Sequence, residues 1–278
     1  MKLRDLITDY IKDYEGLKPQ EKLNYWTTYN DREIVERCID DYMRTGIDYR
    51  KYAMENIFGH KKQKIERMLY VTNTIKKHIG EVIDKIREAF GLYLDDFQVI
   101  IYHGLGNSAG EATKIKGKPT ILFGVEKVVS LGWDNEEKIL NLIVHEYAHL
   151  IHESLQKSGL EREDPIESDV FRIYVEGFAT YMEDVYHGRE NTDWYQKCEE
   201  RKEDLKSECL NRFKRGISCR DFYGDWWEVF GISDTGYYLG YQFIKYLLKE
   251  YGLVEIASFE YNEVQEKLYY FLRFKPGR

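Results

Sequence analysis

The segment from Ile139 to Ile151 constrains the fold most strongly. At helical spacing its apolar residues surround the axis on nearly every side, and such a pattern is typical of a buried central helix. Asn135 is a suitable N-cap, and Glu136 and Glu137 would complement the helix dipole in the first turn. The sequence therefore predicts a buried helix that begins directly after Asn135.

This helix carries three ionisable side chains in the run His145-Glu146-Tyr147-Ala148-His149. Two histidines four residues apart lie on one face of a helix, at a separation that suits two corners of a zinc tetrahedron. Burial of these groups is costly unless a partner satisfies them. A metal would do so, and a hydrogen-bonded pair of core histidines is the alternative. Glu146 would lie within one water of the metal and could act as the general base.

A catalytic zinc site has three protein ligands and one open position. Glu176 is the best candidate for the third ligand, because it lies in an apolar helical stretch and the small Gly177 allows a close helix approach. Glu167 and Asp169 are rivals, although the helix dipole explains them more simply. Leu155 stands where a metzincin would have a further histidine. A cysteine ligand is conceivable, but the downstream cysteines lie in a charged segment expected at the surface.

The motif, followed by a helix with Glu176-Gly177-x-Ala179, resembles the gluzincin zinc metallopeptidases. It is especially similar to small bacterial families of predicted zinc-dependent proteases, in which Tyr237-Tyr238-Leu239-Gly240-Tyr241 would match a tyrosine-rich later helix. The resemblance covers about residues 95–250. It implies a zincin-like core, Zn²⁺ as the cofactor and a peptide or protein as the substrate.

The resemblance implies further roles. The strand around residues 120–124 would be the edge strand above the metal and would bind an extended peptide by strand addition. Tyr237 or Tyr238, and after them Tyr241, would stabilise the oxyanion, with a packed aromatic as the alternative for each. Thermolysin-like enzymes have an aspartate where this chain has Thr180, so Asp184 or a backbone carbonyl would orient a ligand imidazole instead.

The remaining pattern predicts an α+β fold that is predominantly helical, with a small and mainly antiparallel sheet beside the active-site helix. Residues 1–90 read as N-terminal helices, the last of them ending at Gly91, and residues 91–278 as the catalytic domain, unless the chain forms one continuous domain. Strands are expected at Phe97–Tyr102 and Pro119–Gly124, and a flexible loop at Gly104–Gly110.

Composition excludes several classes of protein. The net charge of −8 argues against nucleic-acid partners and anionic membrane surfaces. No run of about 18 apolar residues could span a membrane, and the charged N-terminus lacks the core of a signal peptide. We therefore expect a soluble cytoplasmic protein whose four cysteines are reduced thiols. The glycines around Gly104 have the wrong spacing for a dinucleotide loop, and a strand follows them where a helix would be required.

These features together predict a zinc metallopeptidase that hydrolyses peptide bonds with Glu146 as the general base. Two alternatives stay open: an aminopeptidase or other zinc hydrolase, and a non-catalytic binding or regulatory protein whose fold the metal stabilises. A degenerate site would be expected to lose the base before the ligands, so Glu146 favours an enzyme. Substrate specificity and oligomeric state are not predicted.

Overall fold

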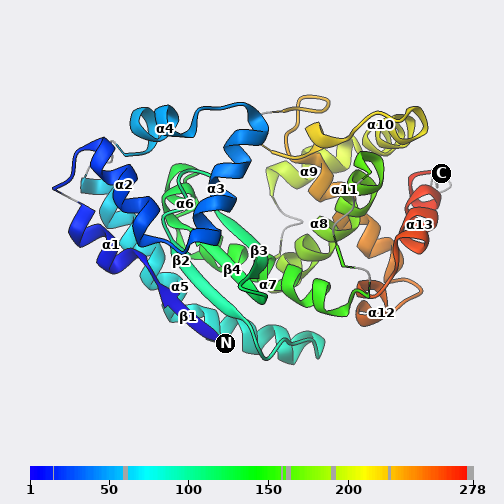
Figure 1. The fold of residues 1–278 in the computed structure, drawn as a ribbon. Helices are drawn as coiled ribbons and strands as arrows, with labels where there is room; N and C mark the ends of the chain where they lie inside the picture. The colour runs from blue at the N-terminus through cyan, green and yellow to red at the C-terminus, as the bar shows by residue number, and fades with distance from the viewer. Residues whose placement is uncertain are drawn as a thin grey trace. The chain divides into compact units, whose positions relative to one another are not determined.

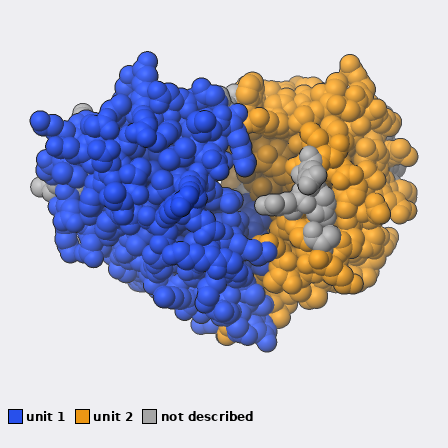
Figure 2. All heavy atoms as spheres, viewed as in Figure 1, with its two compact units in different colours: residues 1–85, 93–150 blue, residues 86–92, 151–278 orange. Residues whose placement is uncertain are grey.

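A computed structural model describes residues 1–14, 16–58, 62–157, 159–160, 164–188, 192–224 and 227–273. The chain is mostly helical with one small sheet (Figure 1). It groups into two compact units, coloured blue and orange in Figure 2. Unit 1 comprises residues 1–85 and 93–150, and unit 2 comprises residues 86–92 and 151–278. The expected domain boundary at residue 90 stays a prediction.

Unit 1 contains all four strands of the sheet: β1 (Lys2–Asp5), β2 (Gln98–Tyr102), β3 (Gly110–Ile115) and β4 (Lys118–Gly124). Its helical elements are α1 (Ile7–Tyr14), α2 (Pro19–Tyr29), α3 (Arg32–Thr45), α4 (Tyr49–Tyr52), the π-helix η1 (Ala53–Ile57) and α6 (Val125–Ser130). Two long helices, α5 (Lys62–Phe90) and α7 (Glu136–Leu155), contribute residues to both units.

The sheet is mixed, with the strand order β1-β2-β4-β3. The pairs β1–β2 and β2–β4 are parallel, and only β3–β4 is antiparallel. The expectation of a mainly antiparallel sheet is therefore wrong. One reason is that β1 was not expected, because its residues were predicted to lie in a helix. The other is that β2 and β4 do not form a hairpin: β3 lies between them in the sequence, so β4 runs parallel to β2.

The N-terminal strand β1 pairs with β2 from Lys2 opposite Gln98 to Asp5 opposite Ile101. The Asp5 carboxylate then accepts hydrogen bonds from the backbone N–H groups of Ile7 and Thr8, at 2.9 and 3.0 Å. An aspartate that satisfies the first free N–H groups is a typical start of a helix. The first helix therefore begins at Ile7, and not at the N-terminus as expected.

The two edge strands are β1 and β3, whereas β4 lies between β2 and β3. This corrects the expectation that residues 120–124 form the edge. Ile121 and Phe123 are fully buried, as a central strand requires. A two-residue turn with positive φ at Lys116 (53°) and Gly117 (72°) joins β3 to β4, which is the geometry of a tight hairpin.

Helix α7 confirms the predicted buried helix. The Asn135 side chain accepts a hydrogen bond from the Lys138 N–H at 2.9 Å and so caps the first turn. Farther along, the Tyr147 hydroxyl accepts the Leu94 N–H at 3.0 Å, and the Tyr147 ring lies 5.3 Å from the ring of Phe97. These contacts fix the middle of α7 to the segment that enters β2.

Unit 2 is helical in its described parts. Its elements are α8 (Pro165–His187), α9 (Asp193–Glu200), α10 (Lys202–Arg215), the 3₁₀ helix η2 (Arg220–Phe222), α11 (Thr235–Leu247), α12 (Leu253–Ala257) and α13 (Tyr261–Arg273). Asp164 caps α8 by accepting the N–H groups of Ile166 and Glu167. Gly177 of α8 lies against Gly240 of α11, so closely that a Cβ on either glycine would overlap the backbone of the other.

Candidate metal centre

The two histidines of α7 point toward one another. Their Nε2 atoms are 3.0 Å apart, and the ring planes are nearly perpendicular, at 85°. Two imidazole nitrogens bound to one tetrahedral zinc are about 3.3 Å apart. The helix thus presents His145 and His149, both half-buried, at nearly the spacing that a shared zinc ion needs.

The last turn of α7 belongs to unit 2 and packs against α8. The buried His152 ring lies 4.6 Å from the ring of Tyr174 and 4.5 Å from that of Phe178. Glu176 stands between these two aromatics on α8 with a side chain that is 16% exposed.

One possible ligand atom from each of His145, His149 and Glu176 lies within 4.8 Å of the other two. In the described part of the chain this is the only group of three that meets that criterion. Two imidazoles and a carboxylate are a donor set typical of catalytic zinc. The residues present therefore fit a zinc ion.

The rival ligands have other roles. The buried Asp169 carboxylate accepts the Cys219 N–H at 2.7 Å, and Glu167 lies in the first turn of α8. The downstream cysteines Cys198, Cys209 and Cys219 are fully buried, although much of the segment that carries them is exposed as expected. All four cysteines of the chain are unpaired thiols in the structure.

Glu146, the predicted general base, is only 5% exposed and lies against the first residue of the edge strand β3. A Cβ added to Gly110 would stand 2.6 Å from the Glu146 Oε1 atom. The sequence pattern predicted a flexible loop at Gly110 and gave no sign of this contact. The turn residues Lys116-Gly117, just before the expected strand Pro119–Gly124, could have indicated a partner strand on their other side.

The segment before Gly110 is held by a buried carboxylate. Glu126 of α6 accepts the N–H groups of Gly104 at 2.9 Å and of Gly106 at 2.6 Å. Bonds from backbone N–H groups to an ionised carboxylate are among the stronger hydrogen bonds in proteins. The glycine-rich stretch is therefore tied to α6 and is not the flexible loop expected.

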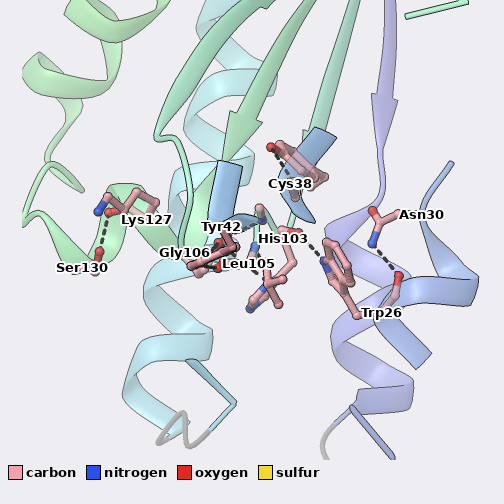
Figure 3. Close-up of polar contacts among 12 residues, drawn as sticks. Trp26, Asn30, Cys38, Tyr42, His103, Leu105, Gly106, Lys127 and Ser130 are labelled. Carbon is pink, nitrogen blue, oxygen red and sulfur yellow. Dashed lines mark hydrogen bonds and ion pairs between the residues drawn. The ribbon is translucent and has the colours of Figure 1, made fainter. Parts of the chain in front are cut away.

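Side chains from α2 and α3 hold the same segment (Figure 3). The Trp26 Nε1–H donates to the carbonyl of His103 at 2.7 Å, and the Tyr42 hydroxyl donates to the carbonyl of Leu105. His103 is 2% exposed, and burial lowers its pKa to about 3. The N-terminal helices thus help to position the strand that meets Glu146.

The tyrosines of α11 differ in their partners. The Tyr238 hydroxyl donates to the Glu199 carboxylate, and burial together with this bond raises the pKa of Tyr238. The Tyr241 hydroxyl donates to Asp184 at 2.6 Å. Tyr237 is half-buried, and its ring lies 5.4 Å from the ring of Tyr223.

Two residues beside Glu176 were not singled out from the sequence. The Arg172 guanidinium lies 4.2 Å from the centre of the Tyr223 ring, and its Nε atom is 3.8 Å from the Glu176 Oε1 atom. Burial alone would lower the pKa of Arg172, but the neighbouring Glu176 carboxylate raises it. The spacing of Arg172 and Glu176, one helical turn apart, was a signal for this pair.

Searches of family models, curated proteins and solved structures found no match to this chain. No helix in the described part of the chain has the length and apolarity that a membrane crossing requires.

Proposed function

We propose that this protein is a zinc metallopeptidase that hydrolyses peptide bonds. The observation that carries the proposal is the grouping of ligand atoms from His145, His149 and Glu176 within 4.8 Å, next to a buried glutamate. Two imidazoles and one carboxylate leave a zinc ion one open position, as a catalytic site needs. The same ligand pattern is the basis of the resemblance to gluzincins.

A zinc ion held by His145, His149 and Glu176 would polarise the scissile carbonyl and would make a water molecule acidic enough to attack at neutral pH. Glu146 takes the proton of that water and passes it to the leaving amine. Its burial against Gly110 supports this role, because a fixed carboxylate loses little free energy in reaching the geometry for proton transfer.

The edge strand β3 is the proposed docking site for the main chain of the substrate. In the described residues it pairs with β4 on one side only, so its other side can add an extended peptide by backbone hydrogen bonds. Because β3 begins at Gly110, a peptide aligned on it would pass close to Glu146.

Of the three tyrosines considered for oxyanion stabilisation, we favour Tyr237. The hydroxyl of Tyr238 donates to Glu199, and that of Tyr241 donates to Asp184. Tyr237 is half-buried and, like Glu176, is close enough to Arg172 to interact with its charge. A phenol in such a place could donate a hydrogen bond to the developing oxyanion.

The test is cleavage of a random peptide library by the zinc-loaded protein, followed by mass spectrometry. The wild type should cut peptides, and Glu146→Gln should keep the metal while its rate falls by about 100-fold or more, the usual contribution of a general base. Glu137→Gln, at an exposed position in the first turn of the same helix, is the matched control and should cleave like the wild type. Equal cleavage by Glu146→Gln and wild type would remove Glu146 from the mechanism.

A further inference from the structure

Two hydrogen-bond donors beside Glu176 have no acceptor among the described residues. The Arg172 guanidinium makes no hydrogen bond to them, since its 3.8 Å approach to Glu176 is too long for one. The Tyr223 hydroxyl is likewise buried without a partner there. Both groups belong to unit 2, as Glu176 does.

The surrounding structure holds the guanidinium in place. Arg172 stacks on the Tyr223 ring at 4.2 Å, and the ring is in turn confined by Gly236, where any Cβ would overlap it. The stacked plane keeps the N–H edge of an arginine available for an acceptor. The Glu176 carboxylate, 3.8 Å from Arg172, would share its charge with the metal when zinc is bound.

The Tyr223 hydroxyl strengthens the case for a missing ligand. The residue is 5% exposed, and a buried polar group without a hydrogen bond costs about 1–3 kcal/mol. Burial raises the pKa of this phenol well above its ordinary value, so it stays protonated and can only gain by donating to an oxygen. A permanent cation and a neutral donor side by side favour an anionic oxygen acceptor.

We infer that Arg172 and Tyr223 form a subsite for a carboxylate of the substrate. The inference rests on the proposed function and adds a substrate class: peptides that carry a carboxylate close to the scissile bond. Arginine binds a carboxylate through two parallel hydrogen bonds, and the phenol adds a third donor. The carboxylate is either the C-terminus of a short peptide or an acidic side chain.

The test measures binding by the zinc-loaded Glu146→Gln protein, so that no probe is consumed. The probes are Ala-Ala-Phe-Ala with a free C-terminal carboxylate or a C-terminal amide, and Ala-Asp-Phe-Ala amide against Ala-Asn-Phe-Ala amide. The first pair reports a C-terminal carboxylate and the second an acidic side chain. In one pair the acidic member should bind about 10- to 100-fold more tightly, as expected for hydrogen bonds to charged groups.

Arg172→Met should abolish that preference, and Tyr223→Phe, which removes only the hydroxyl, should reduce it. Arg50→Met is the control, because Arg50 also stacks on a tyrosine, Tyr49, at 5.2 Å but belongs to unit 1. It should leave the preference unchanged. If Arg172→Met does not fold, the preference for the acidic probe in Tyr223→Phe alone tests the inference.

Equal binding of the acidic and neutral members in both pairs would overturn the inference. So would an undiminished preference in Tyr223→Phe and Arg172→Met. Loss of zinc from Arg172→Met with an unchanged preference in Tyr223→Phe would also overturn it, because Arg172 would then act only by holding Glu176. Failure of the proposed function has a different signature: the wild type would cut no library peptide, whereas the binding preference would still be measurable.

Discussion

At the scale of single residues, Gly110 and Glu146 leave no room between them. A methyl group on Gly110 would stand 2.6 Å from the Glu146 Oε1 atom, so Gly110→Ala must displace the carboxylate. A misplacement of about 1 Å can cost about 100-fold in rate. We expect Gly110→Ala to lose hydrolysis of a library peptide by about that factor while zinc content stays at the wild-type value.

Gly80→Ala is the control for this variant. Gly80 lies inside α5, where an added Cβ meets nothing within 4 Å, and alanine in a helix interior stabilises by about 1 kcal/mol. It should leave the rate unchanged. Wild-type activity in Gly110→Ala would show that the position of Glu146 beside β3 has no part in catalysis.

The buried His103 side chain should make the stability of the folded protein depend on pH. Burial lowers its pKa from 6.5 to about 3, so the folded protein keeps it neutral while the unfolded chain takes up a proton below pH 6.5. The stabilisation from a neutral His103 is therefore complete above pH 6.5 and is lost as the pH falls toward 3. Between pH 7 and 5.5 this amounts to about 1 kcal/mol.

The measurement is urea unfolding of the wild type and His103→Asn at pH 7 and pH 5.5. The free energy of unfolding of the wild type should fall by about 1 kcal/mol more than that of the variant. An equal decrease in the free energy of unfolding of the two proteins would mean that His103 is accessible to protons in the folded state.

The residues of the candidate centre were predictable to different degrees. His145, Glu146 and His149 lie within five residues of one apolar helix, so their spacing and their expected burial together indicated a metal site. Tyr223 could not be predicted, because it reaches Arg172 only after η2 and α8 have packed. Contacts of this kind depend on tertiary structure and leave no local pattern.

At the scale of elements, the crossing of α8 and α11 depends on two glycines. Gly177 and Gly240 place the helix backbones in direct contact, and Glu176 is the neighbour of this contact. Gly177→Ala should reduce the free energy of unfolding by about 1–3 kcal/mol, the usual cost of overpacking a core, and should weaken zinc binding by shifting Glu176.

Thermal unfolding with and without zinc checks this prediction. Gly252→Ala is the control in the same unit, since an added Cβ there meets nothing within 4 Å, and it should cost less than about 1 kcal/mol. An unfolding midpoint of Gly177→Ala that equals the wild-type value would contradict the close crossing.

Helices were easier to predict than strands for a physical reason. Asn135 and Gly91 mark helix ends by local capping, which the structure confirms at α7 and α5. Strands β1 and β3 are short and polar and are stabilised by pairing with partners elsewhere in the chain. Neither sequence contains the run of buried apolar residues by which a strand is recognised. For this reason the two strands were not expected, and the predicted sheet was smaller and differently paired.

At the scale of the whole molecule, the proposed zinc ion would bind the folded chain and not the unfolded one. A ligand with this preference raises stability by about 4 kcal/mol at a thousand times its dissociation constant. The three ligands are supplied by two helices, α7 and α8, so unfolding of either helix would release the ion. The net charge of −8 also favours uptake of a cation over binding of nucleic acid.

The proposed metal site can be measured by zinc stoichiometry. The wild type, stripped with a chelator and titrated with Zn²⁺, should bind about one ion per chain, and His149→Ala and Glu176→Ala should each bind at least about 100-fold more weakly. His187→Ala is the control, since that histidine is exposed at the end of α8, and should bind like the wild type. Full zinc affinity in His149→Ala would contradict the ligand set and, with it, the proposed enzyme.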